Sequence, residues 1–437
     1  MFNGGYLKVQ SGFLKIWKRS CFRIEDGTMR EFTTENGKEV GCFDINICEP
    51  NFCSELASEN AFSMKKDNRI ILFKAESQEE YQRWKELFFD VLNQKSISSL
   101  NKKKVSLDDF VLISVIGRGT FGKVSLVKYI ENDQLYALKS MRKTKLAKVN
   151  YIQQILNERE ILLKNQHPFL VAAHFTFQTE TKLFIVLDYV PGGELLKRLN
   201  VEGRFSEKRT QLYAAEILLG IEHLHKHGII YRDLKPENIL VDEYGHLKIT
   251  DFGFAKNIEN EETTTFCGTP EYLAPEVIRK KAYTKSVDWW AFGIIVYEML
   301  CGCSPFSSSN RKELMESILF DPISFPSYLS PIAIDLINKL LDRNKKTRLG
   351  SGPQDASEIK DHPFFKNVDW DAVLNKRTRP EWIPKIQDPI DVSNFDSEFT
   401  EELPGISFED PILVPKIAQD AFKNFTFDDC ECQVIEA

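Results

Sequence analysis

The 437-residue sequence contains no apolar run long enough to cross a membrane. Its most apolar stretch, WWAFGIIVYEMLCGC, spans only residues 289–303 and includes the acidic Glu298. A membrane-spanning helix needs about 20 mostly apolar residues, so this stretch predicts a buried core helix instead. The N-terminal residues also lack the apolar run of a signal peptide. We therefore expect a cytoplasmic protein.

The sequence also lacks a positive net charge and a disulfide framework. Its formal net charge of −7 argues against binding to nucleic acid. The nine cysteines are an odd number without the spacing of a secreted scaffold, so we expect reduced thiols. Two C-x-C pairs, Cys301/Cys303 and Cys430/Cys432, raise the alternative of metal binding. No histidine lies near either pair in the sequence, which favours free thiols.

Residues 5–75 alternate apolar and polar positions in short runs such as GYLKV, FLKIW and IILFKA. This period of two predicts an antiparallel sheet. The stretch SQEEYQRWKELFFDVLNQ then changes to a helical period, with Ser77 placed as its N-cap. Several strands followed by one helix with a tryptophan resemble a pleckstrin-homology domain, which we assign to residues 1–95. The polar segment 96–109 predicts a linker.

Three glycines follow the linker in the pattern G-x-G-x-x-G: Gly117, Gly119 and Gly122. A dinucleotide-binding fold needs a helix directly after these glycines. Here the alternating segment KVSLVKY follows, which predicts a second strand. Strand, glycine turn and strand together predict a flap over phosphate groups, because glycine lets backbone N–H groups approach phosphate oxygens closely.

Two charged residues beyond the flap are placed to bind phosphates together. Lys139 lies in the predicted strand QLYALKSM, and Glu158 lies in a segment of helical period. A glutamate on a facing helix can hold the lysine ammonium against the α- and β-phosphates, because either charge is costly to bury alone. For Lys139 taken alone, a surface lysine is the alternative interpretation.

The motifs YRDLKPENIL and ITDFGFAK supply the remaining polar groups of a phosphotransfer site. Asp233 and Asn238 lie five residues apart in the first motif, and Asp251 lies in the second. Phosphoryl transfer needs a carboxylate that orients the substrate hydroxyl, for which Asp233 is the candidate. It also needs hard oxygen ligands for Mg²⁺, which Asn238 and Asp251 provide. Lys235 is placed to contact the transferred phosphate.

On these motifs, and on CGTPEYLAPE, SVDWWAFG and KKTRLG after them, residues 110–365 are identified as a member of the eukaryotic protein kinase family. DLKPEN resembles the serine/threonine type, and TFCGTPEYLAPE with FIVLDYVPGGEL resembles the AGC group. The resemblance implies ATP and Mg²⁺ as cofactors, protein substrates, an upstream activating kinase and a Glu276–Arg348 ion pair. It also implies that Asp288 supports the catalytic loop. The residues that it implies in nucleotide binding are Gly117, Gly119, Gly122, Val124, Lys139, Asp188, Val190, Glu194 and Phe395.

The segment 366–437 resembles the AGC tail that wraps around the small lobe. Its sequence FKNFTF matches the hydrophobic motif F-x-x-F-[S/T]-[F/Y]. The resemblance implies that Phe422 and Phe425 dock beside the Glu158 helix and that Thr426 is phosphorylated. Three phenyl rings near a chain end are also costly to leave in water, so docking within the chain is expected on physical grounds.

The activation loop matches its relatives at Thr265, the expected phosphorylation site. A phosphate there is expected to pair with Arg232 and Lys256 and to order the loop. Close relatives place a histidine on the Glu158 helix to reach the same phosphate, but this chain has Gln154. We therefore expect weaker coupling between loop and helix. The nearest position to a further tail phosphosite is Ser407, which lacks the usual following proline, and its modification stays open.

The resemblance also implies a substrate preference. Acidic residues match the positions that face arginines upstream of the target hydroxyl, and three others match the pocket for the following apolar residue. We expect the motif R-x-x-S/T-hydrophobic. For Glu298 the alternative is a structural pairing with a buried arginine. The acidic positions are Glu194, Glu237 and Glu298, and the pocket positions are Phe266, Pro270 and Leu273.

A pleckstrin-homology domain followed by an AGC kinase and a hydrophobic motif resembles the protein kinase B family, whose lipid-binding members need a lysine on the first strand and R-x-R on the second. This chain has Val9 at the first position and Lys18-Arg19-Ser20 at the second. Phosphoinositide binding, weak attraction to anionic membrane, an intramolecular brake and protein docking all stay open. The candidate lipid contacts are Lys8, Lys15, Lys18 and Arg19.

The expected fold is therefore α+β and multidomain: a pleckstrin-homology β-barrel with a C-terminal helix, then a bilobal protein kinase with a wrapping tail. We expect a monomer that is cytoplasmic or peripheral at the plasma membrane. A signalling scaffold with little kinase activity is the alternative function. It would predict the loss of Lys139, Asp233 or Asp251, and all three are present.

Overall fold

A computed structural model describes residues 4–10, 17–25, 28–34, 38–44, 49–51, 60–66, 69–88, 104–119, 121–146, 149–258, 262–407 and 409–427. The chain divides into two compact units, Met1–Lys104 and Val105–Ala437. Within the described residues, no helix combines the length and the apolar character that crossing a membrane requires.

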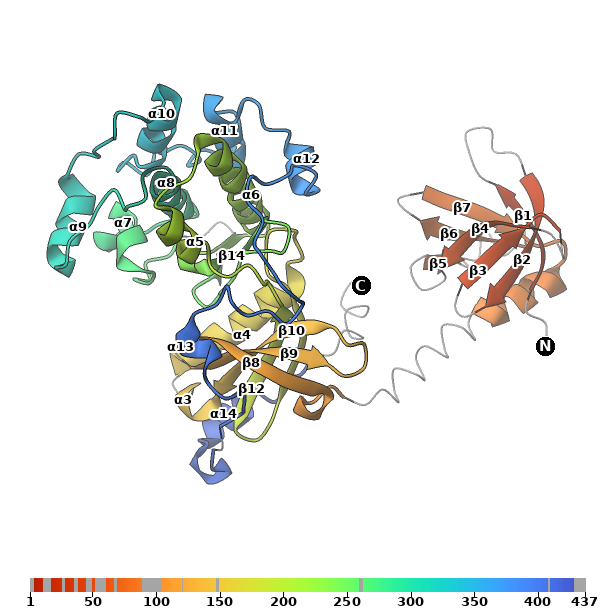
Figure 1. Cartoon of the computed structure of the whole chain (residues 1–437). Coiled ribbons are helices and arrows are strands. Elements are labelled where there is room, and N and C mark those ends of the chain that lie inside the picture. The colour runs from red at the N-terminus through yellow and green to blue at the C-terminus, as the bar shows by residue number, and fades with distance from the viewer. Residues whose placement is uncertain are drawn as a thin grey trace. The chain divides into compact units, whose positions relative to one another are not determined.

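The first unit contains one antiparallel sheet in the order β4-β3-β2-β1-β7-β6-β5 (Figure 1). Its strands are β1 Gly4–Gln10, β2 Trp17–Glu25, β3 Thr28–Phe32, β4 Glu39–Asp44, β5 Glu49–Asn51, β6 Ala61–Lys66 and β7 Arg69–Lys74. A helix follows at 78–88, and the Ser77 hydroxyl accepts the Glu80 N–H at 3.2 Å as the predicted N-cap. Trp84 of this helix packs with Phe22 and Phe73 in a buried core. The pairings of the described residues leave β4 and β5 at the sheet ends, so the closed barrel stays a prediction.

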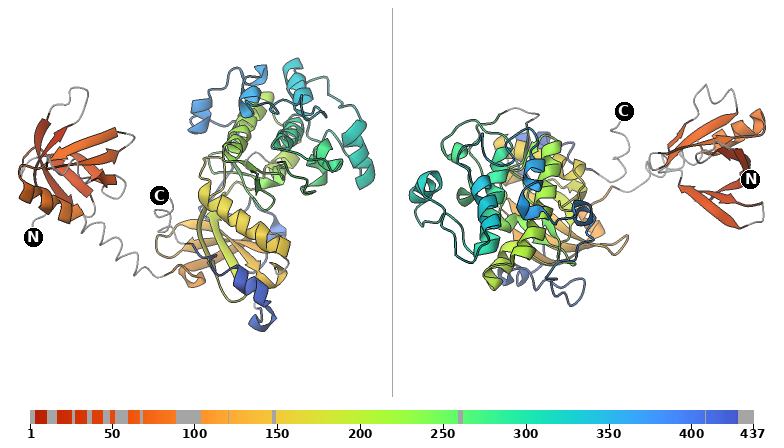
Figure 2. Two further views of the ribbon diagram at one scale, coloured as in Figure 1. Left: turned by 180° about the vertical axis from the view of Figure 1, so that it is seen from behind. Right: turned by 90° about the horizontal axis from the view of Figure 1, so that it is seen from above.

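The second unit has two lobes. The small lobe is a five-stranded antiparallel sheet in the order β11-β12-β10-β9-β8, with two helices beside it. Its elements are β8 Phe110–Arg118, β9 Gly122–Tyr129, β10 Leu135–Arg142, α3 Lys143–Leu146, α4 Val149–Lys164, β11 Ala173–Gln178 and β12 Lys182–Asp188. Seen from behind, α4 lies across this lobe (Figure 2). The third flap glycine is needed for packing, because a Cβ on Gly122 would lie 1.6 Å from the Ser140 carbonyl oxygen.

The large lobe is mainly helical. Its long helices are α6 Glu207–Lys226 and α8 Ser286–Cys301, and α8 is the apolar stretch that the sequence predicts as a core helix. The other helices are α5 Leu195–Glu202, α7 Pro275–Ile278, α9 Arg311–Phe320, α10 Pro331–Leu340, α11 Ala356–Lys360 and α12 Trp370–Leu374. The short strands are β13 Ile229–Ile230, β14 Ile239–Val241, β15 Leu247–Ile249 and β16 Lys256–Asn257.

After α12 the chain returns to the small lobe, as the dark blue ribbon in Figure 1 shows. Its short helices α13 Ser397–Thr400 and α14 Lys416–Ala421 lie beside β8 and α3. The path passes close to the segment between the lobes, where a Cβ on Gly193, whose φ is +74°, would lie 2.4 Å from the Asn394 carbonyl oxygen. The last described residue, Phe427, pairs with Thr176 of β11 through two backbone hydrogen bonds of 2.7 and 3.0 Å.

Candidate active site

The structure brings Lys139 and Glu158 together, as the phosphate site requires. Lys139 Nζ on β10 lies 2.5 Å from Glu158 Oε1 on α4 and 3.8 Å from Asp251 Oδ1. Burial alone would lower the pKa of Lys139, but Glu158 and Asp251 raise it well above its usual value. The ammonium therefore stays charged at any physiological pH and can bind phosphate oxygens.

The catalytic loop holds its polar groups in a closed network. Asn238 Nδ2 donates to the Asp233 carbonyl and to Asp233 Oδ2, both at 2.9 Å. Lys235 Nζ lies 3.0 Å from Asp233 Oδ2 and donates to the Thr269 hydroxyl at 2.8 Å. The Thr269 hydroxyl in turn donates to Asp233 Oδ1 at 2.8 Å. Thr269 and Lys235 thus fix the carboxylate of Asp233, the predicted acceptor of the substrate hydroxyl proton.

Asp288 of α8 holds the backbone of this loop through hydrogen bonds. Its carboxylate accepts the backbone N–H groups of Tyr231 at 2.9 Å and Arg232 at 2.8 Å. These bonds hold Arg232 at a φ of +69°, in the left-handed region that a non-glycine residue adopts only when its surroundings require it. The predicted ion pair beside this helix is also present, since Arg348 reaches Glu276 in a buried two-bond contact of 2.7 and 2.9 Å.

A cleft of about 270 Å³ lies between the lobes. Its apolar walls suit a flat aromatic ring, and its far end reaches Lys139 and Asp251. The apolar residues that line it include Ile116, Val124, Ala137, Leu187, Val190, Leu240 and the tail residue Phe395. Phe395 lies over the Tyr189 ring with the centroids 6.0 Å apart.

Asp188 also lines the cleft, but its side chain is engaged elsewhere. The carboxylate lies 2.7 Å from both His174 Nε2 and Lys248 Nζ and accepts the Ala172 N–H at 3.2 Å. Although burial opposes it, these contacts hold the pKa of Asp188 well below its usual range. We infer that any nucleotide contact at this position comes from the backbone.

The residues at the phosphate end fit a hard divalent cation. The side chain of Asp251 is 53% exposed, and the Asn238 amide nitrogen already donates to Asp233, which leaves the amide oxygen for a cation. Among the described residues, no cluster of three or more histidine, cysteine or acidic side chains forms a metal site by itself. A cation at Asp251 and Asn238 would therefore need further ligands from the nucleotide phosphates.

Two protein-family models match this chain. The model described as "Protein kinase domain" matches residues 110–365, and the model described as "Protein kinase C terminal domain" matches residues 386–427. The chain belongs to the protein kinase family. A full-length similarity places this kinase in the AGC group of serine/threonine protein kinases: it is 37% identical over 431 residues to "RAC family serine/threonine-protein kinase homolog" of Dictyostelium discoideum, covering 97% of this chain and 96% of that protein. The kinase therefore uses ATP and acts on protein substrates.

Two further relatives cover the kinase unit. "Protein kinase 2" of Dictyostelium discoideum is 45% identical over 337 residues, which are 76% of this chain and 70% of that protein. "Protein kinase C-like 2" of Schizosaccharomyces pombe is 42% identical over 334 residues, which are 75% of this chain but only 33% of that much longer protein.

Glu237 lies near two other carboxylates of the kinase, Glu194 in the cleft and Glu298 on α8. Burial raises the pKa of Glu194, and the nearby Glu237 adds to the effect. Burial likewise raises the pKa of Glu298 to about 7, again with a contribution from Glu237. Glu237 Oε2 is buried and accepts no hydrogen bond from the described residues. The partner of Glu298 is the Tyr272 hydroxyl, at 2.8 and 3.1 Å, and not the buried arginine considered as the alternative.

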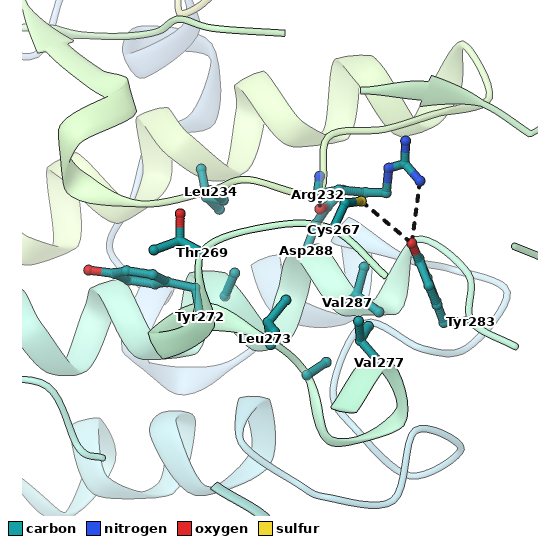
Figure 3. A pocket seen from close by; sticks show the side chains of 12 residues that line it. Arg232, Leu234, Cys267, Thr269, Tyr272, Leu273, Val277, Tyr283, Val287 and Asp288 are labelled. Carbon is teal, nitrogen blue, oxygen red and sulfur yellow. Dashed lines mark hydrogen bonds between the residues drawn. The ribbon is translucent and has the colours of Figure 1, made fainter. Parts of the chain in front are cut away.

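A small cavity lies beside Leu273, one of the three residues expected to form the pocket for the apolar substrate residue. Figure 3 shows the cavity between the activation segment and α8, which has a volume of about 20 Å³, roughly the space of one water molecule. Leu273 lines it, whereas Phe266 is 42% exposed on the surface and Pro270 does not line it. The pocket formed by all three residues stays a prediction.

The expected activation-loop phosphosite, Thr265, is exposed, and one intervening residue links it to each of the two predicted cations. Lys256 Nζ donates to the Thr263 hydroxyl at 3.3 Å, and that hydroxyl lies 3.3 Å from the Thr265 hydroxyl. Tyr283 links Arg232 to Thr265. Its hydroxyl donates to the Thr265 carbonyl at 2.7 Å. The same hydroxyl accepts from Arg232 at 3.3 Å, as Figure 3 shows. Each cation is thus one residue away from Thr265.

The hydrophobic motif is docked on the small lobe of the same chain. Phe422 and Phe425 are fully buried, and their rings meet edge to face with centroids 5.9 Å apart. The Phe425 carbonyl accepts from the Thr176 hydroxyl at 2.5 Å and from Arg159 Nε at 2.7 Å. Arg159 follows Glu158 on α4, so the motif is bonded to the residue next to the phosphate-site glutamate.

A basic pocket of about 400 Å³ surrounds the tail residue Ser407. Its hydroxyl accepts from Arg142 Nη2 and from Lys182 Nζ, both at 3.1 Å. Arg118 and Lys123 also line this pocket and pair with Glu402 of the tail. The pocket supplies several donors to a single hydroxyl, which is the arrangement that a phosphate group prefers.

The basic residues of the first unit lie on two faces of its sheet. Val9 is buried, and Lys18 opposite it has a side chain that is 70% exposed and lies 3.8 Å from Glu31. Ser20 is also buried. Of the three positions at which the lipid-binding pattern needs a basic residue, only Lys18 therefore carries one. Lys15 lies outside the described residues.

Lys8 and Arg19 lie on the other face, directly opposite each other in the β1–β2 register, and Lys74 is opposite Lys8 on β7. Arg19 is already engaged, since its guanidinium bonds to Glu76 at 2.7 Å and lies 4.1 Å from the Tyr6 ring centroid. The three predicted lipid contacts that the structure describes, Lys8, Lys18 and Arg19, therefore do not converge on one face.

Thr269 and Arg159 are functional candidates that sequence reasoning missed. The only sequence signal for Thr269 is its place in CGTPEY, between the expected phosphosite Thr265 and the predicted substrate-pocket residue Pro270. Arg159 carries no sequence signal, because its contact depends on a tail residue 266 positions away.

Proposed function

We propose that this kinase transfers the ATP γ-phosphate, with Mg²⁺ held by Asn238 and Asp251, to serine or threonine in R-x-x-S/T-hydrophobic protein sites. The observation that carries this proposal is the acidic group of Glu194, Glu237 and Glu298. A guanidinium would relieve the mutual repulsion of these carboxylates and give the buried Glu237 oxygen a donor.

The bound Mg²⁺–nucleotide supplies the phosphoryl group and neutralises charge that develops on it. The chain's own residues position the reaction: Asp233 accepts the proton of the substrate hydroxyl, and Lys235 faces the moving charge. Lys139, held by Glu158, orients the phosphates.

We also propose that phosphorylation at Thr265 and Thr426 activates the kinase. A phosphate on Thr265 would lie within reach of Lys256 and Arg232. A phosphate on Thr426 would add charge beside Arg159, which already bonds to Phe425. Phosphorylation at both sites needs an upstream activating kinase, and a third phosphate on Ser407 would occupy the basic pocket.

A positional peptide library tests the substrate proposal. Full-length protein, phosphorylated at Thr265, should prefer arginine three residues before the acceptor and an apolar residue after it. Glu237→Gln should lower the preference for arginine at this position. The rate of transfer to an arginine-free peptide should change much less than the rate of transfer to an arginine-containing one. A preference for acidic or proline-directed sites would contradict the proposal.

For the N-terminal unit we propose a pleckstrin-homology-type domain that contacts anionic membrane weakly or docks another protein surface. The full-length similarity to the RAC family homolog supports this assignment, since it includes the N-terminal unit. The buried Val9 and Ser20 argue against tight phosphoinositide recognition. Sedimentation of the full-length protein with vesicles of phosphatidylcholine, with added phosphatidylserine or with added phosphoinositide, separates these roles. Binding that only phosphoinositide supports, and that Lys18→Ala abolishes, would overturn the weak-contact proposal.

A further inference from the structure

A second cavity continues the nucleotide cleft toward α4. Its volume is about 370 Å³, compared with about 270 Å³ for the cleft. The two spaces share Gly119, Val124, Lys139, Glu158 and Asp251 as lining residues. A group that enters this cavity therefore lies next to the end of the cleft that binds the transferred phosphate.

Beyond the residues that it shares with the cleft, this cavity is lined by three aromatic rings, by Met141 and by the polar Lys123, Ser140 and Gln154. Phe121, at the tip of the flap, meets Tyr151 of α4 edge to face, with ring centroids 4.8 Å apart and an angle of 60° between the planes. Phe254, three residues after Asp251, lines another side and is 38% exposed. Three partly exposed rings around one space can bury an apolar side chain far better than the open surface can.

The position of the acidic group gives the substrate a direction. Glu194 and Glu237 line the nucleotide cleft together with Val190 and Phe395, whereas none of these four residues lines the cavity beside α4. If upstream arginines lie at this acidic end, the chain that follows the acceptor hydroxyl leaves past the flap tip and α4. An extended chain advances about 3.3 Å per residue, so the second to fourth residues after the acceptor lie roughly 7–13 Å beyond it.

We propose that the cavity between the flap tip and α4 is a substrate subsite, which takes an aromatic or large aliphatic side chain from the second to fourth position after the phosphorylated residue. Phe121, Tyr151 and Phe254 are its specificity-determining residues. The proposal rests on the proposed function, because it uses the direction in which an arginine-containing substrate lies. It adds a second selective element on the side of the acceptor opposite the arginines.

The test uses pairs of peptides that share the arginines and the acceptor serine and differ only in phenylalanine or alanine at one downstream position. The ratio of the two kcat/KM values is measured for the full-length, Thr265-phosphorylated protein. We expect phenylalanine to be preferred about tenfold at one of positions two to four, the scale at which an apolar pocket discriminates. Tyr151→Ala or Phe254→Ala should bring this ratio close to one, and Tyr151→Phe, which keeps the ring, should preserve it.

Because both peptides meet the same enzyme, the ratio cancels any general loss of activity from a displaced α4. A ratio of one at all three positions in the unsubstituted protein would overturn the subsite. So would an unchanged ratio in both alanine variants. A complete lack of transfer to arginine-containing peptides is a different result, and it would overturn the proposed function together with the subsite.

Discussion

The substitution Phe425→Ala tests whether the docked tail controls catalysis. Phe425 is fully buried, and its ring offers more than about 100 Å² of apolar surface. At about 25 cal/mol per Å², and with the packing lost around the ring, the substitution should weaken docking by roughly 3 kcal/mol. That is about a 150-fold change in the docking equilibrium. If only the docked state holds Glu158 against Lys139, kcat/KM should fall by up to that factor.

The assay is steady-state phosphorylation of an arginine-containing peptide, together with hydrogen exchange of residues 149–164. We expect lower kcat/KM, faster exchange in α4, and partial recovery of both when a peptide spanning residues 416–427 is added. Phe320→Ala is the matched control, because that ring is 71% exposed on α9 and should change neither measurement. Unchanged activity in Phe425→Ala, despite measured loss of tail protection, would refute the coupling.

Three further predictions concern other parts of the kinase. Arg159→Ala should lower kcat/KM about tenfold and speed hydrogen exchange in α4. Glu160→Ala, an exposed substitution on the same helix, should change neither. Equal effects of the two substitutions would contradict the role of Arg159. The pKa of Glu298 is raised to about 7, so KM for arginine peptides should rise as pH falls from 8 to 6, and a flat KM would contradict this. The raised pKa also means that the folded state favours the neutral acid of Glu298. The stability that this group contributes is therefore present below its unfolded pKa and is lost as the pH rises through 7. Glu298→Gln should therefore raise Tm more at pH 8 than at pH 5. Phosphorylation of Ser407 should raise Tm by several degrees through Arg142 and Lys182, and Arg142→Ala should remove most of this gain; a phosphoserine that leaves Tm unchanged would contradict the binding pocket.

The catalytic residues could be predicted from sequence because each lies in a short segment whose chemistry is local. Asp233 and Asn238 are five residues apart in one loop, and their hydrogen bonds close within that loop. The helix 78–88 and the core helix α8 were likewise predictable from residue spacing and apolar content, which depend on neighbouring residues alone.

The remaining features depend on contacts between distant segments. Thr269 reaches Asp233 across 36 residues, and Arg159 reaches Phe425 across 266, so no local pattern shows what either residue contacts. The reason for Gly122 was also different from the expected one. The phosphates would approach the flap near Gly119, whose Cβ position is open, whereas Gly122 is required by the backbone of β10. The direction of the Asp188 side chain likewise depends on tertiary contacts. It faces His174 and Lys248, which lie 14 and 60 residues away in the sequence.

The account depends most on the convergence of Lys139, Asp233, Asn238 and Asp251 on one magnesium-bound nucleotide. The most direct measurement is the rate of γ-phosphate transfer to an arginine-containing peptide by Asp251→Asn and the unsubstituted protein across a Mg²⁺ titration. We predict a loss of at least about 100-fold and a higher Mg²⁺ requirement in the variant, with unchanged Tm. Transfer at the unsubstituted rate and with the same Mg²⁺ dependence would contradict the account.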